Sequence, residues 1–210
     1  VKTIKADKHI KDLNQWLDFL ESMGYANTKC MILNSLDFGV PQDRERAFII
    51  SHLGDSLDVV NKIEAEKRER KFKIRKFIKS NYKNPIYKLE ADIAQLNKTP
   101  SRDVMWDING KTISNHMIVR TITCNMDRTH TAALFKYNGP KGDTYRRLTM
   151  REAFLLMGFT EKEYVKASSL NFSYRKLNKL IGNSIVVNVL QAIFEAMFGD
   201  TYMKKEAEED

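Results

Sequence analysis

The first fifty residues of the chain show two kinds of hydrophobic pattern, a helical spacing and short continuous apolar stretches. Between residues 8 and 23, apolar residues recur at three- and four-residue intervals, as they do in an amphipathic helix: Ile10, Leu13, Leu17 and Leu20. Gly24 follows as a helix stop. Two short apolar stretches, residues 29–33 and 47–50, then predict strands. The order helix, strand, turn, strand predicts a fragment of an α/β sheet rather than a whole sheet.

The turn between these strands is followed by two arginines. Gly39 and Pro41 predict a tight turn, because glycine accepts backbone angles that other residues resist and proline fixes its own. Arg44 and Arg46 come two residues apart, so both side chains leave the same face if the strand already begins there. Charge at the edge of a buried strand is costly without an anionic or carbonyl-rich partner. From spacing alone, an ordinary turn with two solvated arginines is an equally good interpretation.

Two more helices are predicted in the last third of the chain. Thr149 and Glu152 have the spacing of a capping box. Further on, we expect Gly182 to allow a turn and Asn183 or Ser184 to cap a helix with one apolar side, formed by Val186, Val189, Leu190, Ile193, Phe194 and Met197. The N-terminus of such a helix can receive a carboxylate. An ordinary capped core helix fits the same pattern.

The middle of the chain is strongly basic. Residues 61–88 hold eleven Lys and Arg against three Glu, and the whole chain has a net charge of +8 and a pI near 9.3. Such charge suggests a polyanionic partner without proving one. One interpretation is a solvated segment with a few apolar anchors. The other is a clamp in which Lys71, Lys73 and Arg75 neutralise phosphates without reading sequence.

Cysteine content and hydropathy bear on the redox compartment and on any metal site or membrane span. Cys30 and Cys124 are too few and too isolated to predict a disulfide framework or a zinc site, so we expect no metal and a reducing, cytoplasmic compartment. We expect no apolar run long enough to span a membrane, and the N-terminus lacks the apolar core of a signal peptide. We therefore expect no membrane partner.

Three stretches resemble, in the right order, motifs of the DNA cytosine carbon-5 methyltransferase family. They are GVPQDRER with its following strand, within residues 38–50, YRRLTMREAFLLMGF at 145–159, and IGNSIVVNVLQAI at 181–193. The resemblance implies an α/β fold: the C-terminal part of a Rossmann-like, S-adenosyl-L-methionine-dependent methyltransferase domain and a smaller β-rich target-recognition domain. The implied boundaries are 1–52 for the end of the catalytic domain, 53–180 for target recognition, and 181–210 for a helix that returns to the catalytic domain.

The resemblance also implies roles for particular residues. Arg46 would help to hold a cytosine flipped out of the DNA, and Arg44 would support the same wall of the pocket, a task that suits a permanently charged fork of donors. Asn183 and Ser184 would lie beside the S-adenosyl-L-methionine cofactor. The motif at 145–159 would organise the recognition region.

A weaker resemblance concerns DNA contacts. The stretch from Arg120, RTITCN, is similar to a Thr-Leu-Thr stretch of the family's recognition region, where the first threonine, here Thr121, touches the DNA backbone; we place Thr123 on the same DNA-binding surface. Asn125 and Arg128 follow in a polar loop and are candidates to read base edges in the major groove. A polar turn without a ligand is an equally common use of such residues.

The resemblance leaves the first half of the enzyme unmatched. Val1 would correspond to the valine of the family's Glu-Asn-Val motif, and the chain has neither a glycine-rich turn after a first strand nor a Pro-Cys dipeptide. We therefore expect a polypeptide that binds double-stranded DNA but transfers no methyl group until an N-terminal methyltransferase part or subunit joins it. The alternatives are a non-catalytic DNA-binding module derived from such an enzyme, and a basic globular protein that meets nucleic acid nonspecifically.

Overall fold

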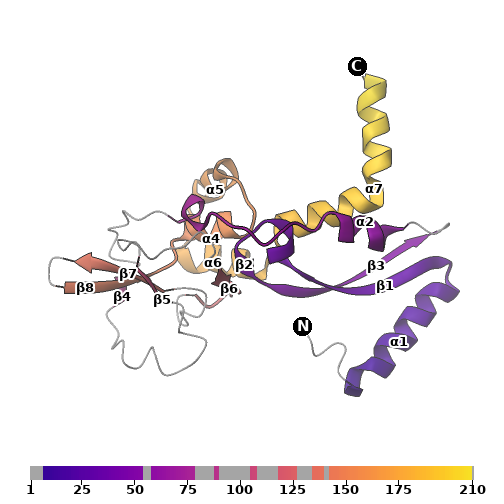
Figure 1. The fold of residues 1–210 in the computed structure, drawn as a ribbon, viewed down its shortest axis with the longest axis horizontal. Coiled ribbons are helices and arrows are strands. Elements are labelled where there is room, and N and C mark those ends of the chain that lie inside the picture. Colours follow the sequence, from indigo (N-terminus) through magenta and orange to yellow (C-terminus); the bar gives the residue numbers. More distant parts are fainter. Residues whose placement is uncertain are drawn as a thin grey trace. The chain divides into compact units, whose positions relative to one another are not determined.

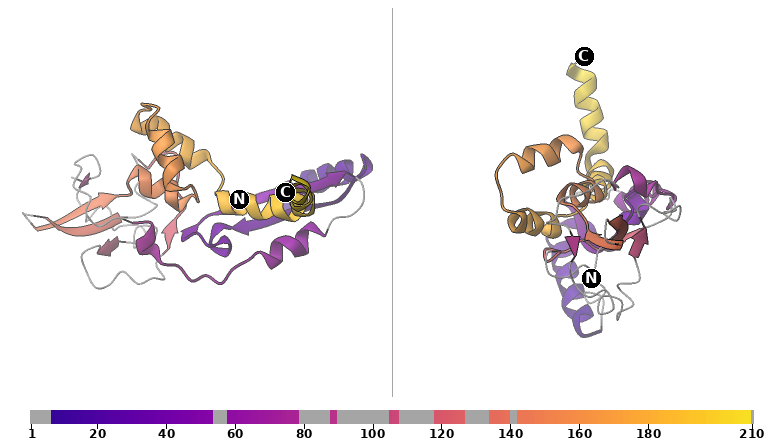
Figure 2. Two further views of the ribbon diagram at one scale, coloured as in Figure 1. Left: turned by 90° about the horizontal axis from the view of Figure 1, so that it is seen from above. Right: turned by 90° about the vertical axis from the view of Figure 1, so that its left-hand side faces the viewer.

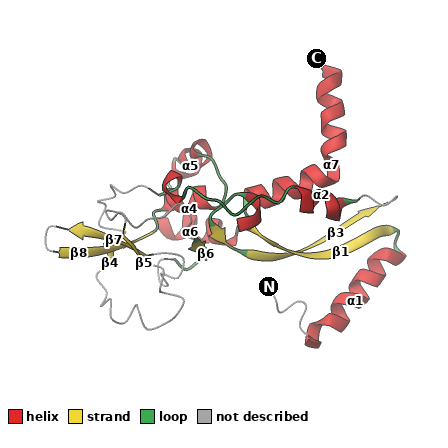
Figure 3. Cartoon of the chain, in the orientation of Figure 1, coloured by secondary structure: helices red, strands yellow, loops and turns green. Residues whose placement is uncertain are grey.

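The computed structural model describes residues 7–53, 58–78, 88–89, 105–107, 118–126, 134–139 and 142–209. Helices and strands both occur along this part of the chain (Figure 1 and Figure 3), as the α/β prediction requires. The chain forms two compact units. The first consists of Val1–Phe38, Glu45–Glu69 and Asn188–Asp210, and the second of Gly39–Arg44 and Arg70–Val187.

The first unit is built on an antiparallel ribbon of two strands, β1 (Tyr25–Asn34) and β3 (Glu45–Leu53). Helix α1 (Asp7–Ser22) precedes β1 and packs on it, as Figure 1 shows. Gly24, with a φ of +86°, makes the turn between them. The predicted first helix and both predicted strands are confirmed. However, β3 begins only at Glu45, so the condition under which Arg44 and Arg46 would share a strand face is not met.

The rest of the first unit consists of η2 (Ser35–Phe38), α2 (Val59–Ala65) and almost all of α7 (Val187–Glu209). Asp58 caps α2 by accepting a hydrogen bond from the backbone N–H of Asn61. Buried apolar side chains come from the ribbon and from all three helical elements: Leu33, Ile50, Leu36, Phe38, Val59, Ile63, Val189, Ala192, Ile193 and Ala196. These side chains form the unit's core.

The second unit contains two small sheets. Strand β2 (Gln42–Asp43) pairs in parallel with β6 (Val119–Arg120). A four-stranded sheet has the order β4 (Lys88–Leu89), β8 (Gly142–Arg147), β7 (Leu134–Gly139) and β5 (Met105–Asp107). Figure 2 shows β7 and β8 as a twisted hairpin. The RTITCN stretch begins with the last residue of β6, Arg120.

The helices of the second unit are η3 (Ile74–Lys76), α4 (Met150–Leu156), α5 (Glu161–Ser168) and α6 (Tyr174–Asn183). The capping box of Thr149 and Glu152 is confirmed in both directions. An equivalent box formed by Thr160 and Glu163 starts α5, and its hydrogen bonds hold the pKa of the Glu163 carboxyl below its ordinary value.

The region around Gly182 differs from the prediction. Gly182 lies inside α6 rather than in a turn, Asn183 is the last residue of α6, and Ser184 is its C-cap. The following helix, α7, begins only at Val187, so neither Asn183 nor Ser184 caps its N-terminus. The residues after Gly182 have the apolar periodicity of a helix, which is why a helix start was expected here. In the structure the amphipathic helix α6 precedes it.

One stretch contradicts the expectation that no apolar run approaches a membrane span. By length and composition, residues Tyr174–Gly199 are sufficient to cross a membrane. In the structure this stretch is divided between α6 and α7, with residues 184–186 outside both helices. Its apolar window is 39% buried, and a core helix of a water-soluble protein passes the same test.

Candidate functional site

Gln42 joins two segments of the second unit through a fully buried amide. Its Nε2 donates to the carbonyl oxygen of Leu156, the last residue of α4, at 2.7 Å, and its Oε1 accepts from the backbone N–H of Ile122 at 3.0 Å. Both partners require the same orientation of the amide. The middle of the GVPQDRER motif therefore fixes the end of α4 against the segment that follows β6.

Arg44 ties the same segment to the end of α6. Its side chain is only 4% exposed; Nη1 donates to the carbonyl oxygen of Ile122 at 2.7 Å, and Nη2 donates to the carbonyl oxygens of Gly182 at 3.0 Å and Ser184 at 2.7 Å. The last carbonyls of a helix have no acceptor role inside the helix and carry partial negative charge. The guanidinium thus acts as a C-terminal cap for α6.

Direct packing completes this assembly. A Cβ at Gly182 would lie 2.2 Å from the backbone nitrogen of Cys124, so only glycine permits this approach. Asn178 donates from Nδ2 to the carbonyl oxygen of Cys124 at 3.1 Å. The backbone N–H of Val187 donates to the carbonyl oxygen of Met157 at 3.0 Å. We call this assembly the motif junction: Gln42, Arg44 and residues 122–124, 156–157 and 182–184.

The motif junction shows how Arg44 is held. Its guanidinium is bound to main-chain carbonyls inside the second unit, and its support of a base-pocket wall stays a prediction. Its effect on any ligand therefore passes through the position of the backbone. It is a positioning residue.

Arg46 lies in the first unit, on β3 opposite Leu33 of β1. It is half-buried, and burial lowers the pKa of its guanidinium from the ordinary value. Nη1 donates to the carbonyl oxygen of Glu45 at 2.6 Å. A guanidinium has five N–H donors, so this one bond orients the group and leaves the larger part of its donor fork for a ligand.

The predicted DNA-reading residues that the structure describes lie after β6. Thr121 donates its hydroxyl hydrogen to the carbonyl oxygen of Asp43 at 2.7 Å, and the Thr123 hydroxyl accepts weakly from the backbone N–H of Asn125 at 3.4 Å. Asn125 is exposed. Arg128 falls outside the described residues. The segment is thus held from β2 while its Asn125 end faces solvent, and its contact with DNA stays a prediction.

The predicted phosphate clamp alternates between exposed and buried side chains. Lys71, Lys73 and Arg75 are exposed, whereas Phe72 and Ile74 between them are buried, at 5% and 0% exposure. The apolar residues anchor the segment, and the cations are held toward solvent. This arrangement suits both interpretations drawn from the sequence, a solvated segment and a clamp.

Asn183 and Ser184 line an open cleft of about 450 Å³ on α6, together with Lys176, Lys179 and Leu180. The Ser184 hydroxyl donates to the carbonyl oxygen of Leu180 at 2.8 Å, and Asn183 is exposed. These two residues offer neutral polar groups to a ligand. No glycine-rich cradle accompanies them among the described residues.

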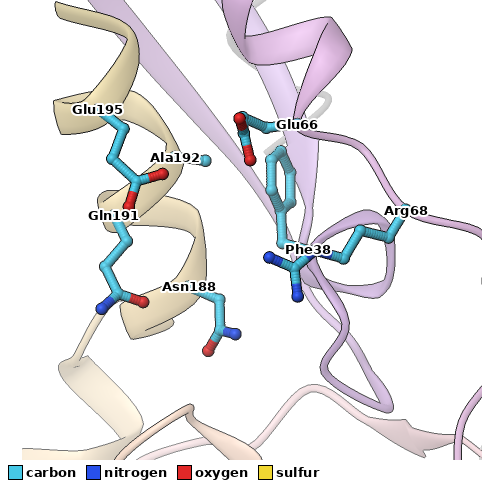
Figure 4. Close-up of a pocket in the computed structure, with 7 residues that line it drawn as sticks. All are labelled: Phe38, Glu66, Arg68, Asn188, Gln191, Ala192 and Glu195. Carbon is cyan, nitrogen blue, oxygen red and sulfur yellow. The ribbon is translucent and has the colours of Figure 1, made fainter. Parts of the chain in front are cut away.

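The first unit has a separate polar pocket. Figure 4 shows Asn188, Gln191 and Glu195 on α7 across from Glu66 and Arg68, with Phe38 at its wall. Its volume is about 50 Å³, room for one or two waters, whereas ligand sites of drug or cofactor size span roughly 300–1,000 Å³. This pocket is therefore too small for an adenosyl cofactor. Within the described residues, no three His, Cys, Asp or Glu side chains gather to hold a metal ion.

Comparison with known proteins identifies the family. The model of the C-5 cytosine-specific DNA methylase family matches residues 1–199. The chain belongs to this family. Two relatives within the methylase family are the type II methyltransferase M2.ScrFI of Lactococcus lactis subsp. cremoris, 31% identical over 94% of this chain, and the orphan methyltransferase M.SssI of Spiroplasma monobiae, 29% identical over 91%. The chain spans about half the length of each relative, 52% and 50%.

Solved structures agree on the fold of this methylase family member. The S. pombe Dnmt2 methyltransferase has a TM-score of 0.67 at 19% identity, over 91% of this chain and 64% of that protein. The Entamoeba histolytica methyltransferase EhMeth has a TM-score of 0.65 at 17% identity, over 90% and 58%. At these identities the likeness concerns the fold alone.

Two residues of the second unit have roles that were not predicted from the sequence. One is Gln42, for which the GVPQDRER motif that contains it was the signal. The other is Arg146, whose guanidinium binds both carboxylate oxygens of Glu152 at 2.9 Å, with both side chains 1% exposed. Glu152 thereby completes the capping box and also pairs with a buried cation, so Arg146, the first arginine of the YRRLTMREAFLLMGF stretch, fixes the start of α4.

Proposed function

We propose that this chain is the C-terminal part of a DNA cytosine-5 methyltransferase, which contributes target recognition and part of the base and cofactor pockets. The motif junction carries the proposal. All three stretches that resemble family motifs, together with the RTITCN stretch, are brought together by Gln42 and Arg44. The order of these stretches along the chain supports its assignment to the back half of the enzyme.

The chemistry of the reaction indicates which groups this chain would supply and which would come from the rest of the proposed enzyme. A cytosine inside a duplex hides carbons 5 and 6, so the base must leave the stack before it can react. Arg46 would donate hydrogen bonds to the flipped base from a half-buried, oriented guanidinium. In the mechanism that the family resemblance implies, a cysteine thiolate adds to carbon 6 of the flipped cytosine. These 210 residues hold only Cys30 and Cys124, neither in a Pro-Cys dipeptide. The nucleophile would come from another part of the enzyme.

The cofactor would be bound mainly by that other part. S-adenosyl-L-methionine supplies the methyl group when it is bound. Asn183 and Ser184 are the residues here that fit its polar groups, because both are neutral and lie at the edge of an open cleft. Their task in this proposal is to close one side of the cofactor site.

Reconstitution tests the proposal. The 210-residue chain is mixed with a polypeptide that carries the family's Pro-Cys and Glu-Asn-Val motifs, together with labelled cofactor and duplex DNA. We expect methyl transfer from the mixture and none from either part alone. Activity of the isolated chain, or an inactive mixture of two parts that bind each other, would defeat the proposal.

Arg46→Ala in the reconstituted enzyme separates catalysis from simple DNA binding. Loss of hydrogen bonds to the flipped base should lower turnover by about 10²-fold or more, in the range found for single transition-state donors, while duplex affinity changes little. Lys29→Ala, which removes an exposed cation of the same strand ribbon outside the basic segment 61–88, is the control. The competing function, a non-catalytic DNA-binding module, is favoured by the basic segment 61–88 and predicts that Arg46→Ala alters affinity or nothing.

A further inference from the structure

The solvent-facing side of α6 is entirely basic or neutral. Its exposed residues are Arg175, Lys176, Lys179, Leu180 and Asn183, and its buried ones are Leu177, Asn178 and Ile181. At 100° per residue the exposed set falls on one side of the helix and the buried set on the other. We call the exposed set the α6 basic face.

Acidic residues are absent around this face in the sequence. No Asp or Glu occurs between Glu163 and Glu195, and all three cations of the α6 basic face, Arg175, Lys176 and Lys179, fall in that interval. Within the described residues, the ion pairs join other cations to acids, and none includes a cation of the α6 basic face. A solvated helix face ordinarily mixes both signs of charge, so this one is selectively cationic.

The lysines border the cleft described above rather than a flat surface. Lys176 and Lys179 share its lining with Leu180, Asn183 and Ser184, in a volume of about 450 Å³. Lys176 is also held in place, because its ammonium lies 3.8 Å from the centre of the Phe172 ring. Two ammonium groups, one of them oriented, an amide and a leucine methyl surface suit a ligand with anionic oxygens and an apolar flank.

We propose that the α6 basic face binds the phosphodiester backbone of nucleic acid, with Lys176 and Lys179 on phosphate oxygens. This inference rests on the proposed function, which supplies duplex DNA as the partner. Asn183 and Ser184 keep the cofactor role proposed above. The lysines have no part in it, because the sulfonium and ammonium of S-adenosyl-L-methionine outweigh its carboxylate, whereas three cations without an acid attract a polyanion.

The position of α6 gives this contact a purpose. The opposite side of the helix holds Cys124 through Asn178 and Gly182, and Arg44 fixes the helix end. Cys124 belongs to the segment with the predicted DNA-reading residues. Phosphate contacts set the register of a protein on DNA and base contacts specify the sequence. Phosphate bound to α6 would thus fix the register of residues 121–125 on the DNA, because Asn178 and Gly182 connect the helix to Cys124.

Salt dependence of DNA binding tests the proposal on the full chain. Each phosphate contact contributes about 0.9 to the slope of log K against log salt concentration. Lys176→Gln/Lys179→Gln should therefore flatten the slope by about 1.8, so that wild-type affinity falls about tenfold more than that of the variant between about 50 and 200 mM salt. The measurement is fluorescence anisotropy of a short labelled duplex.

Matched variants make the result specific. Lys162→Gln/Lys166→Gln removes two exposed lysines from α5 and should keep the wild-type slope. Lys176→Arg/Lys179→Arg should also keep it. Circular dichroism of each variant establishes that α6 is folded, which we expect because both lysines are exposed.

The possible failures are distinguishable. If the wild-type chain binds no duplex, both this inference and the proposed DNA partner are wrong. If the wild-type chain binds and Lys176→Gln/Lys179→Gln has an unchanged slope, only the inference is wrong. If that variant instead loses labelled S-adenosyl-L-methionine in equilibrium dialysis while its DNA slope stays unchanged, the two lysines serve the cofactor site and the inference is overturned.

Discussion

At the scale of single residues, two buried arginines of the second unit are stabilised in different ways. Arg146 is paired with the Glu152 carboxylate, and that pair fixes one helix start. Arg44 binds the main-chain carbonyls of three residues that belong to two segments. A buried charge costs free energy unless it is well hydrogen-bonded, and carbonyls meet that need while restraining the backbone itself. Arg44 is therefore the residue whose loss should disturb the motif junction most.

Arg44→Ala should lower the free energy of unfolding by about 2–4 kcal/mol, because buried carbonyls that lose a charged donor each cost roughly 1–3 kcal/mol when no water replaces it. Arg44→Lys should recover only part of the loss, since one ammonium cannot reproduce a planar fork that spans Ile122, Gly182 and Ser184. Urea unfolding measures both. Arg75→Ala, at an exposed position, should stay within about 0.5 kcal/mol of wild type; an equal effect of the two alanine variants would contradict the role given to Arg44.

At the scale of secondary-structure elements, the sequence predicted what depends on near neighbours. The α1 stripe, the β1 and β3 runs and the Thr149–Glu152 capping box each involve residues a few positions apart, and each was found. Gly182 was misread because its reason is a backbone 58 positions away, at Cys124. Gln42 and Arg44 likewise act on residues 78 to 140 positions away. Their partners are set by tertiary packing, which local periodicity does not contain.

Gly182→Ala tests this account of α6 directly. In a free helix, alanine is more favourable than glycine by about 1 kcal/mol, but here the new Cβ would meet the Cys124 backbone at 2.2 Å. Backbone cannot rotate aside as a flexible side chain can, so we expect a net destabilisation of about 2–3 kcal/mol, within the range for overpacked sites. Gly199→Ala in α7 is the control, because a Cβ there meets nothing within 4 Å. Thermal unfolding should show a lower Tm for the first variant and an equal or higher Tm for the second.

At the scale of the whole molecule, the chain passes between its two units after residues 38, 44, 69 and 187. The GVPQDRER motif is itself divided, with Gln42 and Arg44 in the second unit and Arg46 in the first. The two arginines that the sequence treats as a pair thus have separate tasks. Arg44 organises the unit with the predicted reading segment, and Arg46 presents a donor fork from the strand ribbon.

The first unit also exposes an apolar stripe. Trp16 and Phe19 on α1 and Met23 directly after it are 51%, 57% and 59% exposed, beside the stripe that packs inward through Leu13. Large exposed apolar side chains at this spacing suit a contact with another protein surface. If the chain is part of a larger methyltransferase, as proposed, the remainder of that enzyme should cover this stripe.

Trp16 reports on that contact by its own fluorescence. The chain has two tryptophans, so Trp106→Phe leaves Trp16 as the only one. Upon addition of the polypeptide with the missing motifs, Trp16 emission should shift to shorter wavelength and acrylamide should quench it less, because burial removes the indole from water. Phe19→Lys should weaken both changes, since it places a charge inside the contact. If methyl transfer is restored while acrylamide still quenches Trp16 fully, the two parts join through another surface. The exposed apolar stripe would then need a different explanation.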